Sequence, residues 1–214
     1  MSDLTITDVD VDGALQETHE ALGGDTRGAF FKKAAVGGGA LMGVLPGLAS
    51  GATTKSAKND IKILNYALTL EYLEAAFYKE AVAGGVVNGP ALDGARIVAQ
   101  HEADHVKAIK KALGKAAVKR PDFDFQGTTK DQTKFIATAA TLENTGVAAY
   151  LGQAGNILNP KILAAAASIL PVEARHASFF NDLNGVSFAP ASFEKGKSMA
   201  AILKAVEKTG FIKA

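Results

Sequence analysis

Four long stretches of this chain place apolar residues at helical spacing, and each is bounded by residues that start or stop helices. The first contains neither proline nor glycine until it reaches Gly84-Gly85, a pair that ends helices. The fourth opens with Asn159-Pro160, an N-cap followed by proline at the first helical position. The pattern therefore predicts an all-α fold, with helices over about residues 59–82, 91–113, 130–153 and 160–184.

The predicted helices are joined by two short turns and by one long connector, residues 115–129. Short turns make antiparallel neighbours, so we expect an up-down four-helix bundle built from two helical hairpins, with the connector crossing between them. In the connector, Phe123 and Phe125 alternate with aspartates, and we expect their rings to be tucked against the bundle. Residues 193–208 predict a short fifth helix, and Pro171 predicts a kink in the fourth.

An internal repeat relates the two predicted hairpins. Thr69-Leu70-Glu71 in the first helix aligns with Thr141-Leu142-Glu143 in the third, and each glutamate is followed seven residues later by a tyrosine. In the second and fourth helices, Glu102-Ala-x-His aligns with Glu173-Ala-x-His, and each glutamate is followed 12 residues later by a glycine. The bundle is therefore predicted to have two pseudo-symmetric halves.

The repeated residues have the chemistry and spacing of metal ligands. Residues three apart lie on the same face of a helix, so each Glu-x-x-His aims one carboxylate and one imidazole in one direction. Two such motifs, with one further glutamate from each of the other two helices, form a dinuclear iron or manganese site in a four-helix bundle. Surface carboxylates with two stray histidines are the alternative. The candidate ligands, for two Fe or Mn ions per chain, are Glu71, Glu102, His105, Glu143, Glu173 and His176.

Roles within this set follow from position. Glu102 and Glu173 each stand beside a ligand histidine, so we expect them to bridge the two metals, with the two lone glutamates as terminal ligands. Glu74 is not expected to bind metal, because its repeat partner is Gly146. His101 is expected to point off the ligand face and to lie on the surface.

Two tyrosines share the ligand face. Tyr78 and Tyr150 lie two helical turns beyond the lone glutamates of their helices. They are placed either to donate hydrogen bonds to the ligands, to relay electrons, or simply to pack in the core.

Composition and charge restrict the function. The 214 residues are 48% hydrophobic and 21% charged, which is ordinary for a folded domain. There is no cysteine, which excludes disulfides and thiolate metal sites. The net charge is only +1, and the basic residues form no dense patch interleaved with aromatics, so we expect no nucleic-acid partner.

Residues 1–52 differ in character from the rest of the chain. The first 25 residues are polar and acidic and predict disorder. A basic stretch beginning at Thr26-Arg27 is followed by an uncharged Gly/Ala-rich run to Ala52, the layout of an export signal. The stretch resembles a twin-arginine (Tat) leader with Gly28 in place of the second arginine. We therefore expect export to the periplasm, cell envelope or exterior; the general secretory route, an uncleaved anchor and a flexible linker are the alternatives.

The chain from about Lys58 to Gly185 resembles the bacterial ferritin-like domain family that includes the desiccation-related proteins. The resemblance rests on residues 67–78, 101–105, 123–125 and 172–177. It implies a ferritin-like four-helix bundle with a dinuclear metal site, but not one agreed reaction. We expect redox chemistry on O₂ or peroxide, in iron oxidation, peroxide detoxification or stress protection. The expected division is a tail and leader over 1–52, the bundle over 58–185, and a C-terminal helix within 186–214.

Fold alone does not choose the reaction. A di-metal oxidase or peroxidase is one reading of the site. The alternative is a non-catalytic stress or desiccation-related envelope protein, in which the metal only stabilises the bundle. A homo-oligomer is compatible with the resemblance, but an iron-storage shell is less so, because the leader and the connector would crowd subunit packing.

Overall fold

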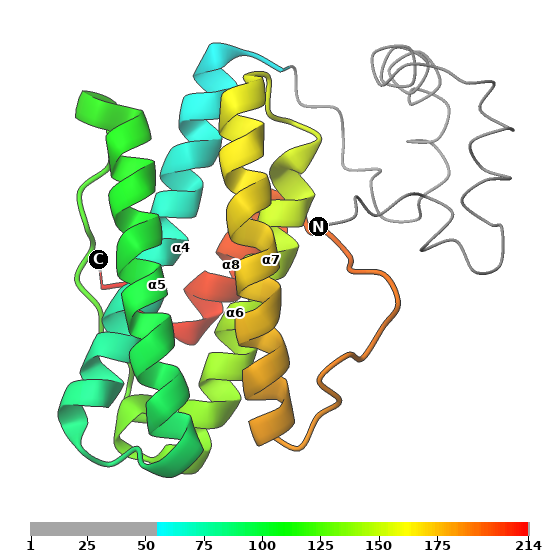
Figure 1. Ribbon diagram of the computed structural model, residues 1–214. Coiled ribbons are helices and arrows are strands. Elements are labelled where there is room, and N and C mark those ends of the chain that lie inside the picture. The colour runs from blue at the N-terminus through cyan, green and yellow to red at the C-terminus, as the bar shows by residue number, and fades with distance from the viewer. Residues whose placement is uncertain (1–54, 214) are drawn as a thin grey trace, which may run out of the picture. The chain divides into compact units, whose positions relative to one another are not determined.

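The computed structural model describes residues 55–213, which form an α-helical bundle (Figure 1). Within these residues there are helices and no strand, so the predicted all-α bundle with a short fifth helix is confirmed. None of the helices in this part of the chain is both long and apolar enough to cross a membrane. The predicted tail and leader lie outside the described residues. The main helices are α4 (Ala57–Gly84), α5 (Gly89–Leu113), α6 (Gln132–Ala154), α7 (Pro160–Leu183) and α8 (Met199–Thr209).

The four long helices pair as two hairpins, α4 with α5 and α6 with α7. In Figure 1 the connector between α5 and α6 runs back along the length of the bundle, so that α5 and α6 point the same way. The single-turn helices η1 (Gly114–Ala116) and η2 (Thr128–Lys130) stand at the two ends of this connector. This is the crossover that the sequence predicts, and it brings the ligand faces of both hairpins to one interior.

Side-chain caps fix where the helices begin. Ser56 Oγ accepts a hydrogen bond from the Asn59 amide at the start of α4, at 3.1 Å. Asp131 does the same for α6 through the Lys134 amide, at 2.8 Å. Asn159 caps α7 just ahead of Pro160, as its sequence predicts, and α7 continues through Pro171.

The connector is anchored by its phenylalanines. Phe125 is 2% exposed, and its ring packs edge-on against Phe77 with the centroids 5.3 Å apart. Phe123 is half-buried and stacks on Phe125. An isolated antiparallel bridge pairs Phe123 with Ile212, near the C-terminal end of the described residues. The predicted tucking of the rings is thus confirmed fully for Phe125 and in part for Phe123.

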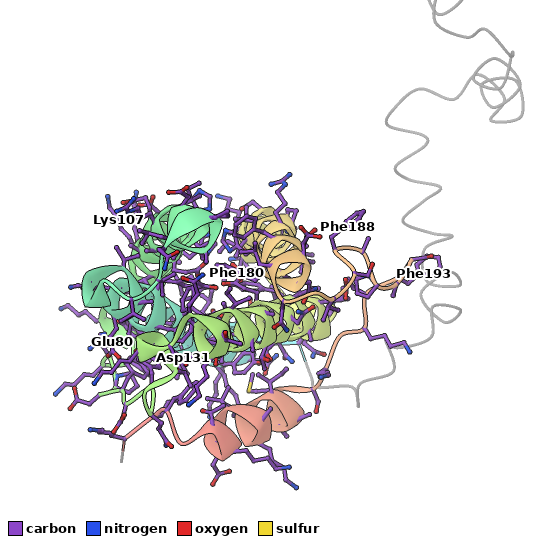
Figure 2. The ribbon with its side chains drawn as sticks, turned by 90° about the horizontal axis from the view of Figure 1, so that it is seen from below. Glu80, Lys107, Asp131, Phe180, Phe188 and Phe193 are labelled. Carbon is purple, nitrogen blue, oxygen red and sulfur yellow. The ribbon has the colours of Figure 1, made fainter. Side chains whose placement is uncertain are left out.

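The fifth helix begins six residues later than the predicted residue 193. Before it, Lys197 donates its backbone N–H to the Ala148 carbonyl of α6, at 2.9 Å, so this segment runs against α6 in a non-helical form. Ser198 then caps α8 by accepting from the Ala201 amide. In Figure 2, α8 lies against α6, while Phe188 and Phe193 project from the segment between α7 and α8.

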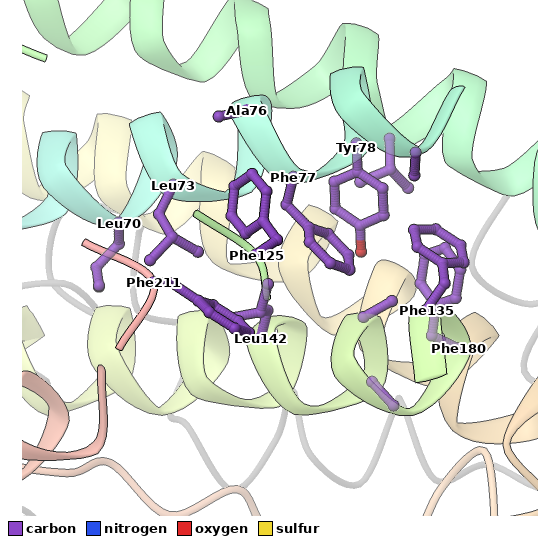
Figure 3. Packing of buried hydrophobic residues seen from close by; sticks show 14 of the residues in the cluster. Leu70, Leu73, Ala76, Phe77, Tyr78, Phe125, Phe135, Leu142, Phe180 and Phe211 are labelled. Atoms are coloured by element: carbon purple, nitrogen blue, oxygen red, sulfur yellow. The ribbon is translucent and has the colours of Figure 1, made fainter. Parts of the chain in front are cut away.

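One side of the core is filled by an aromatic cluster, defined here as Phe77, Tyr78, Phe135 and Phe180 (Figure 3). All four side chains are fully buried. In five pairs of these rings the centroids lie 5.2–5.9 Å apart, in the stacked and edge-to-face arrangements that aromatic side chains prefer. The cluster ties α4, α6 and α7 together.

Candidate metal centre

The six predicted ligands come from all four long helices and meet in the interior of the bundle. The four glutamates are at most 1% exposed, and the two histidine side chains are 5% and 12% exposed. Charged groups are rarely buried this deeply unless they are paired or bind a metal. The side chains come from α4 (Glu71), α5 (Glu102, His105), α6 (Glu143) and α7 (Glu173, His176).

The ligand atoms of these residues form two overlapping groups, in each of which they lie within 4.8 Å of one another. Each group has one glutamate and one histidine of its own, and the two groups share Glu102 and Glu173. The shared pair is the one to which the sequence analysis assigns the bridging role. The unshared members are Glu71 and His105 in the first group, and Glu143 and His176 in the second.

Both histidines turn Nδ1 toward the carboxylates. His105 Nδ1 lies 3.1 Å from Glu71 Oε2 and 3.3 Å from Glu102 Oε2. His176 Nδ1 lies 3.2 Å from Glu143 Oε2 and 3.2 Å from Glu102 Oε1. The two oxygens of Glu102 therefore face different histidines, which is the orientation that a carboxylate needs to join two metal positions.

Three carboxylate oxygens in the centre are buried without a hydrogen-bond partner: Glu102 Oε1 and both oxygens of Glu173. Two of them, Glu102 Oε1 and Glu173 Oε1, lie 3.2 and 3.1 Å from imidazole nitrogens but lack hydrogen-bond geometry. Burial first, and neighbouring carboxylates second, raise the pKa of Glu102 and Glu173 well above the usual range.

The donor set fits a pair of divalent metal ions. Buried carboxylates without partners are costly, and two divalent cations would balance the charge of the four carboxylates. Oxygen-rich sites with two imidazoles suit iron or manganese. Burial lowers the pKa of His105, but the close contacts with the carboxylates of Glu102, Glu173 and Glu71 outweigh it and raise the pKa to about 12. A metal ion bound at Nδ1 would replace the proton that these carboxylates now hold there.

Two tyrosines connect the halves across the centre. The Tyr78 hydroxyl donates to Glu143, and the Tyr150 hydroxyl donates to Glu71, so each tyrosine fixes the lone glutamate of the other hairpin. Burial, followed by the charge of the accepting glutamate, raises the pKa of both hydroxyls well above the usual range. Both tyrosines therefore remain hydrogen-bond donors to the ligands, which is one of the roles open from the sequence.

A fifth glutamate, Glu74, is buried beside the ligands but belongs to neither group. Burial and then the charges of the neighbouring glutamates, Glu173 foremost, raise its pKa well above the usual range, which favours its neutral form. Its repeat partner, Gly146, has no side chain. A Cβ at Gly146 would lie 2.8 Å from Glu173 Oε2 and 3.4 Å from Glu74 Oε1, so the glycine leaves room for both carboxyls.

The prediction that His101 lies on the surface is wrong. Its ring stacks on His176 with the centroids 5.2 Å apart, and its Nδ1 lies 2.9 Å from His176 Nε2. Because α5 faces α7 here, a residue at the edge of the ligand face of α5 reaches the ligand of α7. His176 thus turns Nδ1 to the carboxylates and Nε2 to His101; with a metal ion on Nδ1, Nε2 would carry the proton and His101 would accept it.

The internal repeat carries a signal that sets His101 apart. The repeat partner of His101 is Val172, so a polar residue precedes one Glu-x-x-His motif and an apolar residue precedes the other. Burial and the neighbouring imidazoles of His176 and His105 lower the pKa of His101, which favours its neutral form.

A four-helix bundle that gathers two Glu-x-x-His motifs and two further glutamates at one buried centre defines the class of ferritin-like carboxylate proteins. The family model described as the ferritin-like domain matches residues 59–186. The chain therefore belongs to the ferritin-like domain family. This confirms the ferritin-like part of the resemblance seen in the sequence. A search of the curated proteins gave no match.

Proposed function

We propose that this protein binds two Fe or Mn ions and uses them in redox chemistry on O₂ or peroxide. The observation that carries the proposal is the overlap of two ligand groups at Glu102 and Glu173. A bound pair of such ions supplies a centre that exchanges electrons with oxygen or peroxide. The proposed ligands are Glu71, Glu102, His105, Glu143, Glu173 and His176.

The surrounding residues hold these ligands in place. Tyr78 and Tyr150 orient the two terminal glutamates by donating hydrogen bonds. His101 fixes the ring of His176 through its Nε2 atom. Outer hydrogen bonds of this kind set ligand orientation and metal affinity. The near-complete burial of the carboxylates also keeps bulk water from the centre.

The test begins with metal content. The full chain is loaded anaerobically with Fe(II) or Mn(II), and the metal per chain is measured by elemental analysis. We expect two ions per chain for the wild type and fewer for Glu102→Ala. A wild-type protein that retains less than a few tenths of an ion per chain would overturn the proposal.

Turnover separates catalysis from a structural role. The proposal expects Fe(II) oxidation or peroxide consumption faster than that of Glu102→Ala. If the wild type binds metal but turns over no faster than this variant, and metal removal lowers the melting temperature, the non-catalytic stress or desiccation-related role is the better description.

We also propose that the protein is exported, on the support of the Tat-like pattern in residues 26–52. The Tat route carries folded proteins, which suits a site whose metal affinity depends on prior folding. Arg27→Gln is expected to trap precursor inside the cell, as measured by fractionation. Normal export of this variant would exclude dependence on the Tat route.

A further inference from the structure

The interior on the two sides of the metal centre is filled differently. On the side of Tyr78, the aromatic cluster fills the core, with the rings of Phe77, Phe135 and Phe180 centred 5.3–5.9 Å from the tyrosine ring (Figure 3). On the side of Tyr150, the pseudo-symmetric position holds a cavity of about 200 Å³. Interiors are normally packed too tightly to leave a space of this size.

The internal repeat explains where the cavity comes from. Aligning Glu71 with Glu143 and Glu102 with Glu173 pairs every phenylalanine of the aromatic cluster with a smaller residue. Each of these smaller residues lines the cavity. The pairs are Phe77 with Ala149, Phe135 with Ile63, and Phe180 with Ile109. The cavity therefore occupies the space that aromatic rings fill in the other half.

The cavity walls are mostly aliphatic, and their polar residues are Tyr66, Tyr150, Gln153 and Lys161. Of these four, only Tyr66 has a fully buried side-chain polar atom without a hydrogen-bond partner. Tyr66 lines the cavity and is 7% exposed, yet its hydroxyl is buried with no hydrogen-bond partner. A buried hydroxyl without a partner is destabilising, so a ligand that accepts its hydrogen bond would recover that free energy. Burial and then the charge of Glu74 raise the pKa of Tyr66, so the hydroxyl is available as a donor.

The cavity reaches both the metal centre and the surface. Tyr150 lines it and donates a hydrogen bond to Glu71, so only one side chain separates the cavity from a ligand of the centre. Between α5 and α7, the lining residues Ala108, Ala112 and Ala165 are exposed. These small side chains leave an opening through which a molecule can enter.

We propose that this cavity binds a compact apolar molecule of about six to eight carbons with one hydrogen-bond acceptor, which the Tyr66 hydroxyl holds beside the metal centre. An aliphatic cavity of about 150 Å³ stays dry and takes up benzene, so about 200 Å³ suits a slightly larger molecule. The proposal goes beyond the proposed function, and binding is expected with or without metal.

The test uses 1-alkanols from butanol to dodecanol, titrated by calorimetry into the full chain. Affinity should rise about fourfold with each methylene until the cavity is full at about six to eight carbons, and then level off. Tyr66→Phe should weaken 1-hexanol about fivefold and leave toluene unchanged, because only the alcohol uses the hydroxyl.

Filling the cavity should abolish binding. Ala149→Phe and Ile109→Phe each introduce the residue that the other half carries, and either should remove 1-hexanol binding. Ala164→Phe is the matched control, because it adds the same ring at an exposed position of α7 that does not line the cavity. Melting temperature and metal content show whether each variant is folded.

Two results would overturn the inference: the absence of saturable binding for every alkanol, or unchanged 1-hexanol binding in folded Ala149→Phe and Ile109→Phe. These outcomes are distinct from failure of the proposed function. A chain that binds 1-hexanol in the cavity but no metal would leave the inference intact and remove the metal proposal alone.

Discussion

The two hairpins supply the same ligands but surround them with different side chains. α4 has Glu74 where α6 has Gly146, and α5 has His101 where α7 has Val172. As a result, the His176 side of the centre has an outer imidazole partner, and the His105 side lacks its counterpart. The symmetry is therefore confined to the proposed metal ligands, and the two proposed metal positions are expected to differ in affinity.

The same contrast continues into the core. The Tyr78 side is packed with phenylalanine rings, whereas the Tyr150 side is hollow. Packed aromatic side chains stabilise a fold, and a cavity forfeits those contacts but leaves room for a ligand. One half of the interior thus serves mainly stability, and the other half is suited to binding.

The largest expected effect comes from Glu102 and Glu173, the carboxylates that the two ligand groups share. Glu102→Ala and Glu173→Ala should abolish dinuclear binding, because each carboxylate belongs to both groups. Glu71→Ala and Glu143→Ala should leave one metal per chain. Elemental analysis after anaerobic loading measures the difference. Retention of two ions per chain in Glu102→Ala and Glu173→Ala would show that the shared carboxylates are not required.

Truncating core residues at positions related by the internal repeat should destabilise the protein more on the Tyr78 side of the centre than on the Tyr150 side. Phe180→Ala should lower the free energy of unfolding by about 3–5 kcal/mol, as for other packed phenylalanines. Its counterpart Ile109→Ala should cost about 2 kcal/mol, because its side chain already borders a cavity and loses fewer contacts. Denaturant unfolding of the metal-free protein provides the measurement. Equal losses in the free energy of unfolding for Phe180→Ala and Ile109→Ala would contradict the expected difference between the two sides.

Gly146→Ala should weaken metal binding tenfold or more without destabilising the metal-free fold. The added Cβ lies 2.8 Å from Glu173 Oε2, so that carboxylate must move from its position. Replacing a helical glycine by alanine also contributes up to about 1 kcal/mol of stability. Metal titration and denaturant unfolding test the two effects separately.

Glu74→Ala is the matched control on the other hairpin, and it should retain both metals. If it loses dinuclear binding while Glu71→Ala does not, Glu74 is the ligand contributed by α4.

The smallest expected effect concerns His101. His101→Val gives α5 the residue that α7 carries and removes the hydrogen-bond partner of His176 Nε2. The metal position at His176 should weaken about tenfold, and the position at His105 should stay unchanged. Stepwise metal titration by calorimetry distinguishes the two positions. Equal weakening of both would show that His101 acts on the whole centre.

The residues that meet at the candidate centre could be predicted because they recur twice at helical spacing. The helix ends could be predicted because they carry local signals such as Asn159-Pro160. The contact of His101 with His176 depends on how closely α5 approaches α7, which no local pattern records. The late start of α8 reflects the pairing of Lys197 with Ala148 of α6, another long-range contact. Predicting the cavity requires both the internal repeat and the long-range contacts between helices. The repeat identifies the smaller residues, but it does not show which helix faces pack against one another.

The pairing of Phe123 with Ile212 bears on the order in which the molecule folds. Each hairpin is built from contacts between neighbouring helices, which form early in folding. The connector, by contrast, pairs with a segment far along the chain: the Asp124 amide donates to the Phe211 carbonyl, and the Lys213 amide donates to that of Asp122. Closing so long a loop carries a larger entropic cost, so this step follows hairpin formation. We therefore expect that residues 211–213 reach their places late, and that until then the crossover is held chiefly by the burial of Phe125.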